Sequence, residues 1–285
     1  MYLRDTFLKQ LFSLQKISVS VFIFFLFFRL YAGDPVFKIY GAREAGMGNI
    51  MPVTDPFWTV FQNQGSIAKI RSFTAGINYE NRFFLSELST RSVALALPAG
   101  KASFAGLYSY FGYADYRRQT VAVACGLPLS DRISAGIQID YFNERTYGEY
   151  SAWQSVTCEA GILIEAAENL SLGIEVFNPV PNSIRKNELP SRLRLDISGR
   201  LNSALCAGAG VEMSSGGKPC VSMGMEYKIY KDLSVRGGFR SEFTSFSFGM
   251  GYRAGLAVID IAFYTHEKLG ISTAVSVIFN LRTKK

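Results

Sequence analysis

Histidine is nearly absent from this 285-residue sequence, which has a single one, His266. It lies in residues 264–268, an expected external turn, where a solvated histidine needs no catalytic role. The sequence also lacks a nucleophile elbow, an HExxH motif and any cluster with metal-ligand spacing. We therefore expect no enzyme activity, no metal site and no cofactor.

Long apolar runs are missing after residue 30, although a transmembrane helix needs about 20 consecutive apolar residues. Yet hydrophobic residues make up 48% of the chain, with 23 Phe and 15 Tyr. The apolar residues must therefore be interspersed with polar ones. Such a distribution excludes a helical membrane protein and is what a membrane-spanning β-barrel requires.

Cysteine is scarce, and its spacing includes neither a CxxC pair nor a metal-binding pattern. Each of the four falls inside an expected strand. If a hairpin turns at residues 215–217, Cys206 and Cys220 are not opposite each other, which argues against a disulfide. We interpret all four as small apolar fillers: Cys125, Cys158, Cys206 and Cys220.

An excess of positive charge is also lacking over most of the chain. The formal net charge is +7, but the first 32 residues contribute +3 and the last four another +3, which leaves about +1 between them. Binding to phosphate backbones needs a basic stripe. No such stripe is present, so we expect no nucleic-acid partner.

The N-terminus reads as a secretory signal peptide. Basic residues precede a short apolar core at residues 17–30, and Ala32 offers a small residue for cleavage. The alternative is an uncleaved anchor helix, but about fourteen apolar residues are short for a bilayer. We expect a signal peptide over residues 1–32, with cleavage after Ala32.

From residue 71 onward, apolar and polar residues alternate with period two. In residues 132–141, for example, Ile137 and Ile139 fall on one face and Gln138 and Asp140 on the other. Expected strands of about ten to thirteen residues exceed those of a soluble β-sandwich, which is the alternative. The prediction is an all-β fold, an antiparallel transmembrane β-barrel of about fourteen strands over residues 71–282, with an N-terminal plug and a tail at 283–285. The expected strands are 71–83, 88–98, 101–112, 117–129, 131–146, 151–166, 169–179, 191–202, 204–214, 219–230, 233–243, 244–255, 256–266 and 270–282.

The connections between these strands support the same prediction. With both ends of the barrel on the periplasmic side, every second connection should be short. Residues 98–100, 129–131, 167–169 and 202–203 are tight, whereas residues 178–190 form the longest loop.

Residues 33–70 do not alternate, and Gly and Pro residues interrupt any regular element, among them Gly41, Gly46, Gly48, Pro52, Pro56 and Gly65. A barrel of this size leaves free volume in its lumen. Trp58 and Phe61 would be poorly solvated in a loose periplasmic tail, which is the alternative. We therefore predict that residues 33–70 form a plug inside the barrel.

The run from Gly41 to Gly48, Gly-Ala-Arg-Glu-Ala-Gly-Met-Gly, resembles the start of mature FadL-type outer-membrane barrels, including the PorV and PorQ branch of Bacteroidetes. Residues 260–263 and the last expected strand resemble that family's final hairpin. The family's Asn-Pro-Ala-like turn is replaced here by Asn63-Gln64-Gly65. The resemblance implies a hatch that gates the lumen. The candidate hatch residues are Gly41, Arg43, Gly46, Met47, Gly48, Trp58, Phe61 and Asn63.

The expected inward face carries charges of both signs. They could line a polar conduit, or they could form ion pairs that brace the wall and hold the plug. Their near balance favours bracing, since interior charges are costly unless paired or hydrated. Inward glycines on strands nine to twelve leave space either for the plug or for an apolar ligand. The candidate lumenal charges are Arg132, Glu175, Arg192, Arg194, Asp196, Glu212, Glu226, Arg236, Arg240 and Asp260.

Two functions follow from the sequence. The first is a passive channel for small hydrophobic molecules, with outer-membrane lipid and a hydrophobic ligand as partners. The second is a non-transporting barrel that serves type IX secretion, with secretion-machine proteins as partners. Both functions place the chain in the bacterial outer membrane as a multi-pass barrel.

Overall fold

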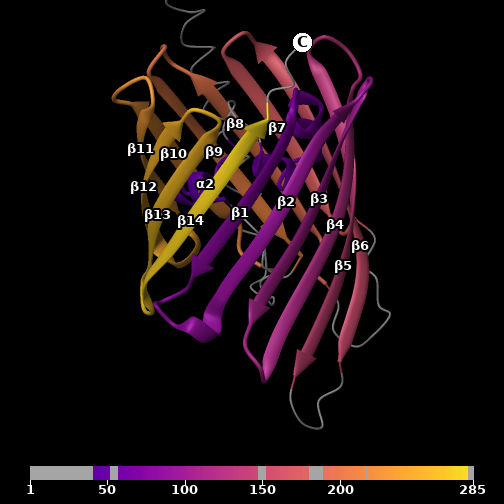
Figure 1. Ribbon diagram of the computed structural model, residues 1–285, viewed down its shortest axis with the longest axis vertical. Coiled ribbons are helices and arrows are strands. Elements are labelled where there is room, and N and C mark those ends of the chain that lie inside the picture. The colour runs from indigo at the N-terminus through magenta and orange to yellow at the C-terminus, as the bar shows by residue number, and fades with distance from the viewer. Residues whose placement is uncertain (1–40, 52–56, 147–151, 180–188, 216, 282–285) are drawn as a thin grey trace, which may run out of the picture.

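The computed structural model describes residues 41–51, 57–146, 152–179, 189–215 and 217–281. The predicted signal peptide, residues 33–40 and the tail at 283–285 lie outside these residues. Within them, fourteen antiparallel strands form a closed barrel (Figure 1). This confirms the predicted fold class. The strands are β1 Phe73–Asn81, β2 Ser89–Ala99, β3 Ala102–Gly112, β4 Tyr116–Pro128, β5 Ile133–Thr146, β6 Trp153–Ala167, β7 Leu170–Phe177, β8 Arg192–Arg200, β9 Leu205–Ser214, β10 Cys220–Lys228, β11 Leu233–Arg240, β12 Ser245–Ala254, β13 Ala257–His266 and β14 Gly270–Leu281.

The barrel closes between its first and last strands. β1 pairs with β14 from Phe73 opposite Leu281 to Asn81 opposite Thr273. Each strand otherwise pairs with its neighbours in sequence. Because every strand has two partners, the barrel has no free edge, and its backbone can span a membrane without unpaired polar groups.

The connections alternate as expected. At the end where β1 begins and β14 ends, the turns have two to four residues. At the opposite end, here called the external end, the connections include residues 178–191. Several predicted strand ends differ from the observed ones by one or two residues, and the largest difference is at β11, which ends at Arg240 rather than at residue 243. A 3-10 turn, η4 (Glu242–Thr244), follows, with Phe243 at φ 55°.

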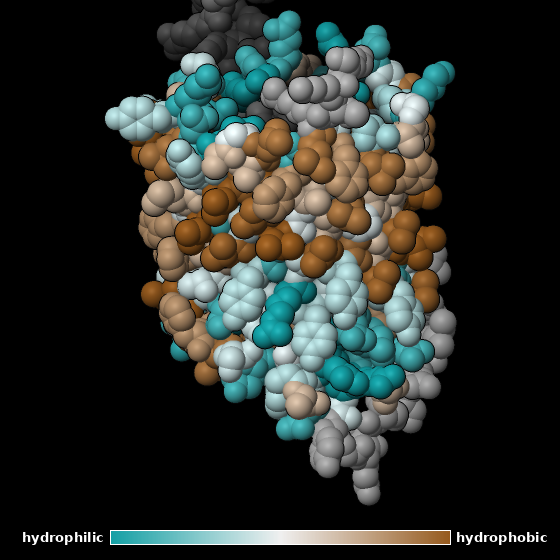
Figure 2. Space-filling view, viewed as in Figure 1, coloured by the Kyte–Doolittle hydropathy of each residue, from teal (hydrophilic) through white to brown (hydrophobic). Residues whose placement is uncertain are grey.

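The period-two pattern puts apolar side chains on the outer wall. Ile137, Ile139 and Met225 are each more than half exposed. Figure 2 shows a brown belt across the middle of the face in view, with paler and teal side chains above and below it. In a membrane this belt contacts lipid. No helix among the described residues is long and apolar enough to cross a membrane.

Residues 41–51 and 57–70 lie inside the barrel, so the structure contains the N-terminal plug that the predicted fold includes. The plug contains the short helix α2 (Ala42–Gly46) and two 3-10 turns, η1 (Thr59–Phe61) and η2 (Gln64–Lys69). Met47, Trp58 and Val60 are almost completely buried inside the barrel. We refer to residues 41–51 as the first plug lobe and to residues 57–70 as the second plug lobe.

The cysteines lie in strands, as expected. All four are free. Cys206 pairs in register with Glu226, and Cys220 pairs with Glu212, so the two cysteines are not opposite each other.

Candidate functional site

The first plug lobe is held to the wall by a buried ion cluster of Arg43, Glu226, Arg236 and Asp260. Arg43 donates from Nε and Nη2 to the two carboxylate oxygens of Glu226, both at 2.8 Å. Arg236 donates to Glu226 Oε2 and to Asp260 Oδ1, both at 2.7 Å. The cluster thus joins the plug to β10, β11 and β13. Bidentate arginine–carboxylate pairs fix orientation as well as position.

Wall glycines let the first lobe approach the barrel backbone. A Cβ on Gly224 would lie 2.1 Å from Met47 O, and one on Gly238 would lie 2.2 Å from Gly48 N. Gly48 itself has φ +65°, which disfavours L side chains. The inward glycines therefore make room for the plug here. This decides between the two interpretations that the sequence left open for Gly224 and Gly238.

The second lobe is held by amide side chains. Asn63 donates from Nδ2 to the carbonyl oxygens of Ile162 and Ile174, at 3.0 and 3.2 Å. Gln64 donates from Nε2 to Glu159 Oε2 at 2.7 Å. A Cβ on Gly65 would lie 2.6 Å from Leu163 N. Gln64 and Gly65 therefore both contact the wall at β6.

An apolar cluster packs the second lobe against a different part of the wall. Trp58 contacts Phe57 edge to face, with ring centroids 5.1 Å apart, and lies 6.4 Å from the ring of Phe61. These side chains and Ile67 are buried against small apolar residues of the inner wall. The wall residues on β2, β3 and β4 are Ala94, Ala96, Ala105, Leu107, Ala122 and Ala124.

The two lobes meet at Glu44. Thr59 donates from Oγ1 to Glu44 Oε1 at 3.0 Å, while Glu44 Oε2 is buried without a hydrogen-bond partner among the described residues. A Cβ on Gly41 would overlap the Trp58 ring, so these segments are tightly packed. Burial raises the pKa of Glu44 above its ordinary value, against the opposing effect of Arg43.

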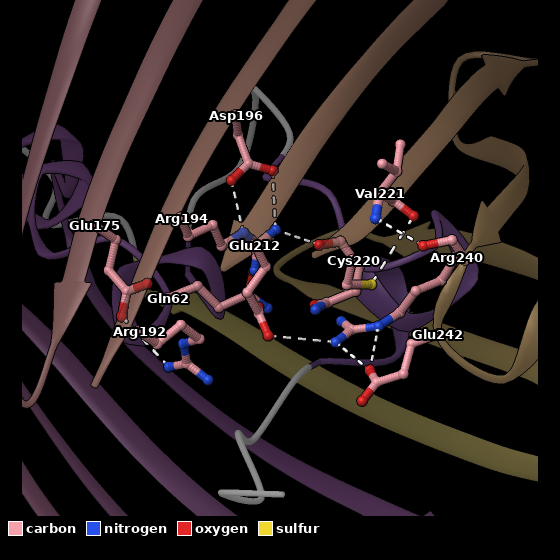
Figure 3. Close-up of polar contacts among 12 residues, drawn as sticks. Gln62, Glu175, Arg192, Arg194, Asp196, Glu212, Cys220, Val221, Arg240 and Glu242 are labelled. Carbon is pink, nitrogen blue, oxygen red and sulfur yellow. Dashed lines mark hydrogen bonds and ion pairs between the residues drawn. The ribbon is translucent and has the colours of Figure 1, made fainter. Parts of the chain in front are cut away.

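Further lumenal ion pairs lie beside the plug (Figure 3). Arg194 donates from Nε to Asp196 Oδ2 at 2.6 Å and from Nη1 to Gln62 Oε1 at 3.2 Å. It also donates to Asn49 O in the first lobe. Arg194 therefore contacts both plug lobes from β8.

The ion pairs of Arg192 and Arg240 complete the predicted set. Arg192 and Glu175 lie 3.4 Å apart between β8 and β7. Arg240 pairs with Glu212 at 3.4 Å and with Glu242 at 2.5 Å. Each predicted lumenal charge on a strand thus takes part in an ion pair, which favours bracing over a one-sign conduit.

Arg132 is the exception among the predicted lumenal charges. It lies exposed in the turn before β5 rather than on the inner wall. The predicted alternation began too early, because Arg132 precedes Ile133, the first residue of β5. His266 also differs from expectation, because its ring is half-buried and stacks on Phe243 at 4.4 Å between ring centroids.

Sequence reasoning missed several residues that hold the plug. Glu44, Gln62 and Gln64 were not predicted to hold the plug, because the plug has no periodicity that assigns an orientation to each residue. Glu159 could have been found, since it shares the inward parity of β6 with Ser155 and Thr157.

A small cavity remains between the second lobe and the wall. It has a volume of about 110 Å³ and is lined by both polar and apolar groups, including Lys69, Glu165 and Met51. Lys69 Nζ and Glu165 Oε2 form an ion pair at 2.5 Å. An apolar cavity of about 150 Å³ holds one benzene molecule, so this space is too small and too polar for a larger hydrophobic compound. Among the described residues, no group of His, Cys, Asp and Glu could hold a metal ion.

Comparison with known proteins shows similarity in fold. No protein-family profile matches the chain, and no curated protein matches it. A FadL homologue from Pseudomonas aeruginosa superposes with a TM-score of 0.65 at 12% identity, covering 88% of this chain and 100% of the homologue. The P. putida toluene transporter TodX gives a TM-score of 0.66 at 11% identity, covering 86% of this chain and 99% of TodX. At these identities the likeness is one of fold.

Proposed function

We propose that this chain is an outer-membrane channel for small hydrophobic molecules, closed by its plug in the structure described. The observation that carries this proposal is the apolar inner wall of β2, β3 and β4. Water-filled barrels have polar interiors, whereas this part of the lumen carries Ala94, Ala105, Leu107 and Ala122 beneath plug aromatics. The fold shared with a toluene transporter supports the same proposal.

Passage requires the plug to move. The second lobe covers the apolar wall, and the cavity of about 110 Å³ beside it is too small for more than one small ring. If the second lobe withdraws, Leu107 and the wall alanines become the lining of an apolar path. On the external side of the plug, Phe142 and Phe177 are buried on the inner wall, with ring centroids 6.4 Å apart.

A reversible crosslink between plug and wall tests this mechanism. A Cβ on Gly173 of β7 would lie 3.0 Å from Asn63 Nδ2 in the second lobe, so an Asn63→Cys/Gly173→Cys pair is close enough to be oxidised. The four native cysteines are replaced by alanine in this variant. We expect the oxidised protein in liposomes to lose uptake of toluene, and a reductant to restore it.

The controls are the two single-cysteine variants, treated with the same oxidant. Each single-cysteine variant should transport toluene at the same rate before and after oxidation. Equal toluene uptake by the oxidised and reduced double variant would contradict gating by the plug. Uptake no faster than in empty liposomes in every variant would contradict the channel itself.

The second candidate is a non-transporting barrel that acts in type IX secretion. It is favoured by the close packing of the lumen, where the ion cluster and Arg194 hold the first lobe from several strands. Affinity isolation from native outer membranes should then recover secretion proteins. Deletion of the gene should block cargo export and leave hydrophobic uptake unchanged.

A further inference from the structure

Two arginines face each other on the outer wall at the external end. Arg117 on β4 is directly opposite Arg145 on β5. Both share the outward parity of exposed Val121, Val123 and Ile139 on the same strands. Like charges directly opposite each other destabilise a sheet. Among the described residues, neither guanidinium forms an ion pair, so an anion bound between them would relieve this repulsion.

A third outward arginine and a row of polar groups extend this surface. Arg91 on β2 is opposite Tyr110 on β3, which is opposite Gln119 on β4. Gln119 donates from Nε2 to Tyr108 Oη at 3.2 Å and accepts from Asn143 Nδ2 at 3.4 Å. We call Arg91, Arg117 and Arg145 the basic patch. Two carboxylates, Asp115 and Glu87, lie exposed in the adjoining external turns, so the surface retains an excess of positive charge.

An apolar groove begins beside Arg91. It has a volume of about 520 Å³ and runs over the outer faces of β14, β1, β2 and β3. Arg91 is one of its lining residues, so charged and apolar contacts adjoin each other. In Figure 2 the same face shows pale ring-bearing and teal side chains directly below the brown belt. The other principal lining residues are Ile77, Val93, Val275, Val277, Tyr108 and Tyr110.

We propose that this surface binds a phosphorylated lipid of the surrounding membrane leaflet. The basic patch holds the phosphate groups, and the groove holds an acyl chain of the same lipid. Guanidinium groups bind phosphate oxygens in bidentate geometry, and basic clusters at the membrane surface recognise anionic headgroups. A bound phosphate also removes the repulsion between Arg117 and Arg145. The inference rests on the barrel lying in a membrane and does not require transport.

Binding of diphosphoryl lipid A to the full-length mature protein in a neutral detergent tests the proposal. The variant is Arg91→Gln/Arg117→Gln/Arg145→Gln. The matched control, Arg71→Gln/Arg132→Gln/Lys231→Gln, removes three exposed positive charges at the opposite end. We expect the patch variant to bind at least about tenfold more weakly, since one charged hydrogen bond accounts for about that factor, while the control binds like wild type.

Three further arms separate the sources of binding. Phosphatidylcholine tests the acyl groove alone, inorganic phosphate tests the arginines alone, and monophosphoryl lipid A tests the number of phosphates. We expect the order diphosphoryl lipid A, monophosphoryl lipid A, phosphatidylcholine, with inorganic phosphate weakest. Equal lipid A affinity in the patch variant and wild type would overturn the proposal, as would phosphatidylcholine binding as tightly as lipid A. Retention of the heat-modifiable barrel band on gels shows that each variant is folded.

Discussion

The two plug lobes are held in one lumen by different interactions. The first lobe meets β10 to β13 through Arg43 and the ion cluster, with its backbone against wall glycines. The second lobe meets β2 to β4 through Trp58, Phe61 and Ile67, with amide contacts to β6. Ion-paired contacts depend on geometry and on each partner's presence, whereas apolar contacts depend on area and fit. The charged side is suited to hold the plug and the apolar side to pass a hydrophobic molecule.

The largest expected effect comes from breaking the charged side at Arg236. The Arg236→Met substitution leaves Asp260 without its ion-pair partner and removes one of two arginines from Glu226. Removing one member of a buried ion pair costs about 3–5 kcal/mol. We expect this loss in the free energy of unfolding, measured by urea titration in detergent. Exposed Arg132→Met is the control.

The same variant should release the first lobe selectively. Arg43 is buried in the wild-type barrel, so trypsin should cleave after it only when this lobe leaves the wall. Faster cleavage at Arg43 is expected in Arg236→Met. If cleavage and unfolding both match wild type, the ion cluster does not hold the plug.

The next largest effect comes from the apolar side. Ile67 is fully buried in the apolar cluster between the second lobe and the inner wall. Truncation of a buried isoleucine to alanine costs about 2–4 kcal/mol. In a Trp153→Phe background, Trp58 is the sole tryptophan. We expect Ile67→Ala to shift Trp58 emission to the red while Arg43 stays protected from trypsin. Lipid-facing Ile137→Ala is the control. Equal exposure of both lobes would show that the plug moves as one unit.

A smaller effect is expected at Gly65, where the second lobe lies against the wall backbone. In Gly65→Ala the added Cβ would lie 2.6 Å from Leu163 N and 2.9 Å from Ser134 O. Such overpacking costs about 1–3 kcal/mol. Gly237→Ala is a matched control, since a Cβ there meets nothing within 4 Å. The Trp58 red shift should appear only in Gly65→Ala. An unshifted Trp58 emission spectrum in Gly65→Ala would mean that the wall backbone moves to accommodate the added methyl group.

The barrel could be predicted from sequence because two-residue periodicity assigns a face to every strand residue. Even β3, with aromatics on both faces, follows this rule, since Phe104 and Tyr108 face lipid while Leu107 and Phe111 face the lumen. The pairing of Glu226 with Arg236 follows from inward parity on adjacent strands.

The plug contacts could not be predicted in the same way. Residues 41–70 have no period, so nothing in the sequence orients Glu44 inward or places Asn63 beside Ile162. The inward wall glycines on β9 to β12 indicated only that there is space beside these strands for the plug or for a ligand. The sequence could not say that Met47 and Gly48 occupy that space, because the contact joins segments about 180 residues apart and depends on backbone shape.

The smallest expected effect concerns Glu44, where the two lobes meet. Its carboxylate is buried, and burial raises its pKa above the ordinary value of 4.5. The docked plug therefore binds a proton more tightly than the released plug does. Docking gains stability as pH falls through the raised pKa, and that gain is lost as pH rises above it. Arg43 and Thr59 oppose the shift, and Asp260 adds to it.

In the Trp153→Phe background, wild-type Trp58 should become less accessible to acrylamide as the pH is lowered from 8 to 5. Glu44→Gln cannot ionise, so its Trp58 should be protected at pH 8 and show a flatter profile. A Glu44→Gln profile as steep as that of wild type would assign the pH dependence to another group. Glu44 would then connect the two lobes without contributing to their pH dependence.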